Sequence, residues 1–406
     1  MVNHNRKNPL LTTLDGLLCE HLDKSELGWV GLARELAQDG FRRRADMFDR
    51  ENRFPSENYY DLRNAGLLAL TVPKEYGGLG ANAVTYVSVL FEISKGCAAT
   101  GLTFNMHCAI IDFLSQIASE DQKKRYYDEV VNEGALLASI TSEPTSSFRD
   151  VFKIKTTIKN DGDGYRLNGT KGWCSLSTAA RYYFTWSRLE NSNNLSEGLL
   201  NVLIPSERKG VEVLDDWDTI GMRATASNSI NFNDVRIEQS EVIGEPGILL
   251  TKDLSFWSLG YTAVYTGIAE AAYEFSVEYG CKQLTKFDDG SPQVARIHRQ
   301  VGEMSMAIEG ARRAMEKLAL MRGQMNRVEL TYILNQAKYL ATEAALSISQ
   351  QGMCMLGGSG LSRALPMQQF LRDALAGQVM PPANDRCIET VGRIALGVEA
   401  KTIEFS

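Results

Sequence analysis

The period of the hydrophobic residues changes twice along the chain, and this restricts the possible folds more than any other feature. Apolar residues recur every three or four positions over about 84–117 and again from about 249, as on one face of a helix. Within about 138–248, short stretches alternate apolar with polar residues, as in half-buried strands. We therefore predict a mostly helical α+β chain with an N-terminal helical domain (1–137), a central β-sandwich or barrel (138–248) and a C-terminal helical bundle (249–406).

The clearest helix is expected to begin at Ser291-Pro292, because serine is a good N-cap and proline suits the first helical position. Beyond it, apolar or small residues are spaced alternately by three and four. This stripe consists of Val294, Ile297, Val301, Met304, Ile308, Ala311, Met315 and Leu318. Such a stripe is typical of a helix that packs lengthwise against other helices, so we assign it to the core of the bundle.

The middle of the chain predicts short strands joined by tight turns. Period-two alternation starts at about 152–158, and the residues Asn160 to Gly164 that follow favour a turn. Further strands are expected at 165–167, 182–187, 199–204 and 229–232. Asn168-Gly169 predicts a hairpin-type turn, so we expect an antiparallel sheet. The absence of strand–helix alternation and of a G-x-G-x-x-G motif disfavours a Rossmann domain.

Composition excludes several classes of function. The 406 residues carry a formal net charge of -7, whereas nucleic-acid binders usually have a basic surplus. No uncharged apolar run reaches about 18 residues and the N-terminus lacks a secretory pattern, so we predict a cytoplasmic protein without a membrane span. The seven cysteines are scattered without a C-x-x-C pair, which favours free thiols in a reducing compartment. The four histidines are far apart in sequence, so we predict no metal site.

Several short motifs, in order, resemble successive signatures of the acyl-CoA dehydrogenase superfamily. They are Thr141-Ser142-Glu143-Pro144, Asn168 to Ser175, Gly221 to Ser227 with Asn233 to Arg236, Gly357 to Gly360, and Leu371 to Ala374. The resemblance covers roughly residues 35–400. It implies N-terminal helices, a central β-domain and a C-terminal four-helix bundle. It also implies a flavin (FAD, or alternatively FMN) between the β-domain and the bundle, in a homodimer or homotetramer.

The resemblance also implies which residues hold the cofactor. Trp173 would form an aromatic wall for the flat flavin ring, with Ser142, Cys174 and Ser175 along its polar edge. Ser175 stands where the family places a hydroxyl against flavin N5, and a donor there would stabilise the reduced ring. Gly357 and Gly358 would also contact the cofactor, and Arg223 would bind substrate. Taken alone, Trp173 could equally be a core residue and Ser175 a turn residue.

The sequence departs from the family at the catalytic base. The usual glutamate, nine residues after the arginine of the Arg-Asp-Ala signature, is replaced by Pro381, and the alternative position on the first bundle helix is Trp257. Two residues are candidates for proton transfer or substrate orientation: Asp385, four residues past the missing glutamate, and His107, on a helix that borders the family's active site. Both have a structural alternative, because Asp385 can cap a helix and His107 can be a satisfied, partly buried helix residue.

Three further departures concern binding. The family's FAD-pyrophosphate arginine is replaced by Leu284, and the glutamine usually three residues before Gly-Gly is Cys354. The sequence Ser146 to Asp150 replaces the family's Gly-Ser-Asp stretch near the acyl group, so we expect an uncommon substrate pocket.

Three functions remain open at this stage. The first is oxidation of an acyl thioester, on coenzyme A or an acyl-carrier protein, with a separate electron acceptor. The second is a two-component flavin monooxygenase that takes reduced flavin from a partner reductase and needs no α-proton base. The third is a catalytically silent homologue, because a fold does not guarantee activity.

Overall fold

The computed structural model describes residues 18–144, 154–192 and 194–398. They form two compact units, each assembled from separate stretches of the chain. The first unit holds residues 18–46, 82–101 and 258–398, and the second holds the described residues of 47–81 and 102–257. The division into three consecutive domains stays a prediction.

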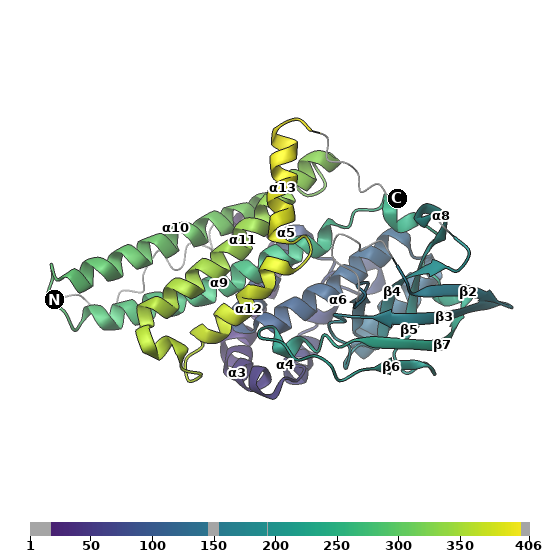
Figure 1. The fold of residues 1–406 in the computed structure, drawn as a ribbon, viewed down its shortest axis with the longest axis horizontal. Coiled ribbons are helices and arrows are strands. Elements are labelled where there is room, and N and C mark those ends of the chain that lie inside the picture. The colour runs from purple at the N-terminus through teal and green to yellow at the C-terminus, as the bar shows by residue number, and fades with distance from the viewer. Residues whose placement is uncertain (1–17, 145–153, 193, 399–406) are drawn as a thin grey trace. The chain divides into compact units, whose positions relative to one another are not determined.

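The first unit is built from helices. Its main helices are α2 (Lys24–Leu36), α5 (Ala83–Gly96), α9 (Ser255–Leu284, from Ser258 on), α10 (Pro292–Met321), α11 (Arg327–Leu356), α12 (Met367–Val379) and α13 (Asn384–Ala395). Shorter turns are η1 (Cys19–His21), η2 (Ala37–Phe41) and η10 (Gly357–Leu361), and α3 (Arg42–Glu51) begins here. Helix α11 packs along α10 and against α12 and α13, as Figure 1 shows. The predicted bundle is therefore a set of long helices around α11.

Helix α10 confirms the strongest helix prediction. The Ser291 hydroxyl accepts a hydrogen bond from the Val294 amide, and Pro292 occupies the first helical turn. The predicted stripe is buried along α10, except for Val301, which is half-buried. The stripe runs along most of this 30-residue helix, which packs against α11 and α5.

The second unit contains one seven-stranded sheet. Its strands are β1 (Leu137–Ile140), β2 (Thr157–Asp161), β3 (Gly164–Lys171), β4 (Tyr182–Leu189), β5 (Leu199–Pro205), β6 (Val211–Val213) and β7 (Ile230–Glu238). The order is β1-β4-β2-β3-β7-β6, with β5 also paired to β4. Strand β5 occupies one edge of β4 over Tyr182–Arg188, so β1 and β2 divide the other edge between them.

Two expectations about this sheet were wrong. It is not purely antiparallel, because β1 and β2 both pair with β4 in parallel. Asn168-Gly169 is not a hairpin turn but an irregularity inside β3, where the register against β7 shifts between Leu167 and Gly169. Gly169 has φ 147°, and a Cβ there would lie 2.7 Å from the Thr156 backbone, so this glycine serves a close strand approach.

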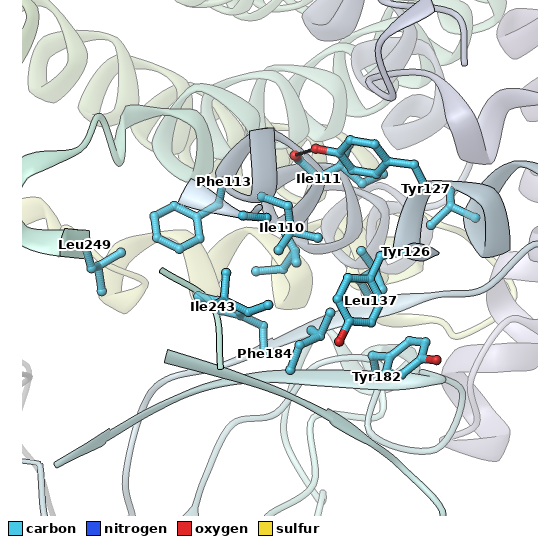
Figure 2. Packing of buried hydrophobic residues seen from close by; sticks show 14 of the residues in the cluster. Ile110, Ile111, Phe113, Tyr126, Tyr127, Leu137, Tyr182, Phe184, Ile243 and Leu249 are labelled. Carbon is cyan, nitrogen blue, oxygen red and sulfur yellow. Dashed lines mark hydrogen bonds between the residues drawn. The ribbon is translucent and has the colours of Figure 1, made fainter. Parts of the chain in front are cut away.

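The second unit also contains helices, of which α6 (Ala98–Ile117, from Leu102 on) and α7 (Glu120–Asp128) pack on the sheet. The others are α4 (Ser56–Asn64) and α8 (Leu195–Gly198), with the short turns η3 (Leu67–Ala69), η4 (Lys74–Tyr76), η5 (Glu129–Glu133), η7 (Arg223–Thr225), η8 (Gln239–Glu241) and η9 (Ile248–Thr251). Figure 2 shows the core between α6, α7 and the sheet. Phe113 packs edge-on against Phe184 at 5.0 Å, and Tyr126 packs against Tyr182 at 5.2 Å. These aromatic pairs fix the sheet against its helices.

Two features were sought among the described residues, a helix able to span a membrane and a cluster able to bind a metal ion. Among these residues, no helix combines the length and apolar character that crossing a membrane requires. Nor do three or more His, Cys, Asp or Glu side chains gather there into a group that would hold a metal ion.

Candidate cofactor site

Two loops of the second unit lie side by side and are joined by backbone hydrogen bonds. We call Trp173–Ser177, which follows β3, the first loop, and Met222–Asn228, which precedes β7, the second loop. The amides of Cys174, Leu176 and Ser177 each donate at 3.1 Å to carbonyls of the second loop, namely those of Asn228, Thr225 and Ala226. The two loops therefore form one rigid ledge at the end of the sheet.

The backbone of this ledge is strained at four positions. Trp173, Leu176, Met222 and Ala226 all have φ between 46° and 68°, a region that non-glycine residues rarely occupy. Each such residue costs on the order of 1 kcal/mol or more and persists only where neighbouring contacts impose it. Such strain is common at functional sites, so the ledge is a candidate site on structural grounds alone.

A chain of hydroxyl groups runs through the ledge. Ser175 Oγ lies 2.9 Å from Ser227 Oγ, and Ser227 Oγ lies 2.7 Å from Thr225 Oγ1. The Thr225 hydroxyl donates in turn to the Met222 carbonyl at 2.8 Å. All three hydroxyl residues are buried, with Ser175 exposing 7% of its surface. The ledge is therefore polar but carries no charge along this line.

Trp173 is the exposed aromatic residue of the ledge. It leaves 62% of its surface accessible, although it is large and apolar. Its ring meets the Trp217 ring edge-on, with the centroids 5.6 Å apart. Trp217 is held from both ends: its indole Nε1 donates to the Arg223 carbonyl at 3.0 Å, and its amide donates to Asn228 Oδ1 at 3.0 Å. A flat apolar face is thus presented on a fixed support two residues from Ser175, whose amide donates to the Trp173 carbonyl at 3.1 Å.

A buried ion pair holds the Thr141–Pro144 motif next to the first loop. Lys171 Nζ lies 3.0 Å from Glu143 Oε1, and the Gly172 amide donates to the Ser142 carbonyl at 3.0 Å. Burial opposes ionisation of Glu143, but Lys171 and the amides of Thr156 and Lys155 lower the pKa of this carboxyl below its usual value. Ser142 itself is half-buried. Its carbonyl, rather than its side chain, makes the contact with the first loop.

Two further predicted site residues have structural contacts. Cys174 is fully buried, and burial raises the pKa of its thiol, so it supplies a backbone amide rather than a reactive group. The Arg223 guanidinium donates to the Asp49 carbonyl at 3.0 Å and to the Thr219 carbonyl at 2.8 Å, and it pairs with Asp218. These bonds fix the position of the second loop, and substrate binding by Arg223 stays a prediction.

His107 lies on α6 in a closed environment. It is fully buried, its Nδ1 accepts from the Leu137 amide at 3.1 Å, and its Nε2 lies 3.0 Å from the Leu68 carbonyl. The proton must therefore be on Nε2, since a carbonyl can only accept. Burial lowers the pKa of His107 to about 4. Both nitrogens are used by backbone groups, which favours the structural alternative that the sequence left open.

The remaining predicted residues belong to the first unit. Gly357 (φ 62°) and Gly358 are exposed at the end of α11. Pro381 is exposed after α12, and Asp385 is exposed in the first turn of α13, where its Oδ1 accepts from the Arg386 amide at 2.8 Å. The N-cap of α13 is Ala383, so the expectation that Asp385 caps a helix was wrong: its carboxylate lies within the first turn and bonds the next amide. The Ser146–Asp150 stretch lies outside the described residues.

Sequence reasoning missed the residues that support the ledge. Thr225 and Ser227 lie inside a quoted motif, but only Arg223 was singled out there. Trp217 and Asn228 border this motif and carried no signal of their own. The density of hydroxyl residues in Ala224 to Ser229 was the one local sign that could have indicated a polar chain.

Models of one family match the chain in three consecutive segments. They are the acyl-CoA dehydrogenase N-terminal domain over residues 26–133, the middle domain over 138–235 and the C-terminal domain over 259–380. The chain belongs to the acyl-CoA dehydrogenase family. It is therefore a flavoprotein-type oxidoreductase by descent, and the predicted fold class is confirmed.

Individual relatives of this family member fall into two functional groups. The short-chain specific acyl-CoA dehydrogenase of Rattus norvegicus is 29% identical over 81% of this chain and 80% of its own length. The dibenzothiophene monooxygenase of Rhodococcus erythropolis is 30% identical over 90% and 93%. The structure of TdsC from Paenibacillus sp. A11-2 with FMN and indole, also a dibenzothiophene monooxygenase, matches with a TM-score of 0.83 and 27% identity over 94% of this chain and 100% of that chain.

The ledge fits a flavin in its chemistry. The isoalloxazine ring is flat, apolar on its faces and polar along one edge. Trp173 offers an exposed aromatic face, and Ser175 offers a hydroxyl beside it without a competing charge. Flavin binding is therefore consistent with both the family and the geometry.

Proposed function

We propose that the protein is a flavin-dependent monooxygenase that takes reduced FMN from a separate reductase. The observation that carries this proposal is the missing base. Pro381 and Trp257 occupy the two positions where the family places its carboxylate, and neither side chain accepts a proton. Asp385 and His107, the two substitutes, are engaged in a helix turn and with backbone groups. Monooxygenation requires no proton removal from the α-carbon of a substrate.

Bound reduced flavin would supply the two electrons that activate oxygen. The overall reaction balances as substrate, O₂ and reduced FMN giving oxygenated substrate, water and oxidised FMN. In this reaction the chain's own residues would hold the ring. Trp173 would stack on its face, Ser175 would hydrogen-bond its polar edge, and the ledge would keep both in place.

The choice of FMN over FAD rests on two substitutions in the first unit. Leu284, at the end of α9, replaces the arginine that would bind the FAD pyrophosphate, and the exposed Cys354 replaces a glutamine. FMN has no pyrophosphate, so neither loss weakens its binding. The relative TdsC also carries FMN in its structure. A homodimer or homotetramer in the cytoplasm stays a prediction.

Oxidation of an acyl thioester, on coenzyme A or an acyl-carrier protein, is the second candidate. The short-chain acyl-CoA dehydrogenase relative favours it. This function would need a base other than the residues considered above, together with an electron acceptor.

One experiment separates the candidates. The purified protein is supplied with FMN, NADH, a flavin reductase and indole or dibenzothiophene under ¹⁸O₂. A product that contains one ¹⁸O atom supports the monooxygenase. Anaerobic bleaching of the FAD-loaded protein by butyryl-CoA would instead support the dehydrogenase. A protein that binds neither flavin would be a silent homologue.

The position of the flavin has its own test. Ser175→Ala removes one hydrogen bond to the ring, so binding of reduced FMN should weaken by about 1–3 kcal/mol. Unchanged affinity for reduced FMN in a folded Ser175→Ala protein would mean that the ring does not contact this ledge.

A further inference from the structure

We propose that Thr225 and Ser227 are positioning residues that make Ser175 a hydrogen-bond acceptor toward the cofactor. The site would then prefer reduced FMN over oxidised FMN. This inference rests on the proposed function, since it takes the Ser175 hydroxyl to face the flavin ring.

The direction of the hydroxyl chain follows from counting protons. The chain has three oxygen–oxygen contacts, Ser175–Ser227, Ser227–Thr225 and Thr225–Met222, and three hydroxyl protons to fill them. The last contact ends on a carbonyl, which can only accept, so the Thr225 proton must point there. The Ser227 proton must then fill the contact to Thr225, and the Ser175 proton must fill the contact to Ser227. Any other arrangement leaves one close contact between oxygens without a proton.

Burial keeps this direction fixed. Thr225 exposes none of its surface and Ser227 exposes 5%, so water cannot easily replace a lost proton donor. The Met222 carbonyl that ends the chain is held in place, because Met222 has φ 52° and Trp217 Nε1 also donates to that oxygen, at 3.3 Å. The end of the chain is therefore set by the backbone of the second loop.

The consequence for Ser175 is a change of role. Its proton points into the protein, so only its lone pairs remain for a ligand. Oxidised flavin presents a bare N5, which can only accept, whereas reduced flavin carries hydrogen on N5 and can donate. An acceptor at Ser175 therefore complements the reduced ring and not the oxidised ring. This polarity is the reverse of a donor at N5, which the resemblance alone implied.

The test measures binding rather than activity. The dissociation constants of FMN and of reduced FMN are measured anaerobically for the wild-type protein and for Thr225→Val, Thr225→Ser and Ser227→Ala. The wild-type protein should bind reduced FMN more tightly. Thr225→Val has nearly the same shape but no hydroxyl, so the Ser227 proton can turn to Ser175 and free the Ser175 proton for the ligand. The preference for reduced FMN should then fall about 3- to 10-fold.

The other variants act as controls. Thr225→Ser keeps the chain and should keep the wild-type preference. Ser227→Ala should lower the preference as Thr225→Val does, and it keeps the test valid if Thr225→Val does not fold. In a Ser175→Ala background, Thr225→Val should change nothing further.

Two outcomes overturn the inference in distinguishable ways. If the wild-type protein binds FMN but folded Thr225→Val or Ser227→Ala retains its full preference for reduced FMN, the hydroxyl chain does not set the polarity of Ser175, although the proposed function can stand. If the wild-type protein binds neither form of FMN, the proposed function fails together with the inference.

Discussion

The two units each contain a fully buried lysine that holds a loop, and the two lysines differ in their partners. In the second unit, Lys171 Nζ contacts the Glu143 carboxylate at 3.0 Å and the Thr141 carbonyl at 3.2 Å. In the first unit, Lys338 Nζ contacts only neutral oxygens among its hydrogen-bond acceptors, Gly377 O at 2.6 Å and Asn384 Oδ1 at 2.7 Å. Both lysines are fully buried, but only Lys171 has a carboxylate among its hydrogen-bond acceptors.

The difference changes what each lysine does with pH. Burial lowers the pKa of Lys338 to about 8, and Cys387, Glu343 and Asp385 oppose this only in part. Burial also lowers the pKa of Lys171, but there Glu143 opposes it through a direct ion pair. We infer that the loop beside the ledge keeps its ion pair at neutral pH. The connection between α12 and α13, which carries Pro381, should respond to mild alkali.

The largest loss of stability should come from breaking the Lys171–Glu143 ion pair. Lys171→Met leaves the Glu143 carboxylate buried without its cation, so the free energy of unfolding should fall by about 3–5 kcal/mol. Urea denaturation measures this change in the free energy of unfolding. Lys159→Met, on an exposed position of β2, is the matched control and should change stability by no more than about 0.5 kcal/mol. A loss below about 1 kcal/mol for Lys171→Met would show that the pair is not the support of this loop.

Lys338→Met should cost less, about 1–3 kcal/mol, because it leaves neutral acceptors rather than a charge unpaired. The loss should also grow with pH. Since the pKa of Lys338 is lowered to about 8 from 10.5, the folded state binds fewer protons than the unfolded state between these values. Wild-type stability relative to the variant therefore rises from pH 8 to 10.5, by at most about 1.4 kcal/mol per pH unit. Denaturation at pH 7 and pH 10 measures this, and a pH-independent loss would contradict the comparison.

His107 lies in the second unit, as Lys171 does, but its ring nitrogens contact only neutral backbone groups, as Lys338 does. It therefore tests whether a neutral partner or the unit itself makes a buried group sensitive to pH. Its pKa is lowered to about 4 from 6.5, so its stabilising effect is present above pH 6.5 and lost as the pH falls through 4. Between pH 6.5 and 5, the wild-type protein should lose about 2 kcal/mol relative to His107→Asn. The matched control is His298→Asn, at an exposed position of α10, which should change stability by no more than about 0.5 kcal/mol. If the free energy of unfolding changed equally with pH in the wild-type protein and in His107→Asn, His107 would not be a source of pH sensitivity. Of the groups compared, only Lys338 in the first unit would then remain as one.

Sequence patterns predicted those parts of the molecule that depend on local signals. Helix α10 follows from its cap and stripe, and β4 and β5 follow from apolar runs bounded by turns. The parallel pairing of β1 with β4 was not predictable, since Leu137 and Tyr182 meet across 45 residues without a periodic signal. The same holds within the site. Trp173 and Ser175 came from the motif resemblance, but Lys171–Glu143 and Ser175–Ser227 join residues that only the folded sheet brings together.

The smallest effect should appear at Trp217, where neutral contacts hold the ledge. Trp217→Leu removes the edge-on ring beside Trp173, so FMN affinity should fall by about 0.5–1.5 kcal/mol. Trp217→Phe keeps a ring but loses the Nε1 donor to the Arg223 carbonyl, so it should retain more FMN affinity than the leucine variant. Titration of FMN by its fluorescence measures both. Equal losses for the two variants would assign the support of Trp173 to the indole hydrogen bond instead of the ring. In that case Trp217 would support the ledge through a hydrogen bond, as the two buried lysines support their loops. The comparison between a charged and a neutral partner would then apply to Lys171 and Lys338 only.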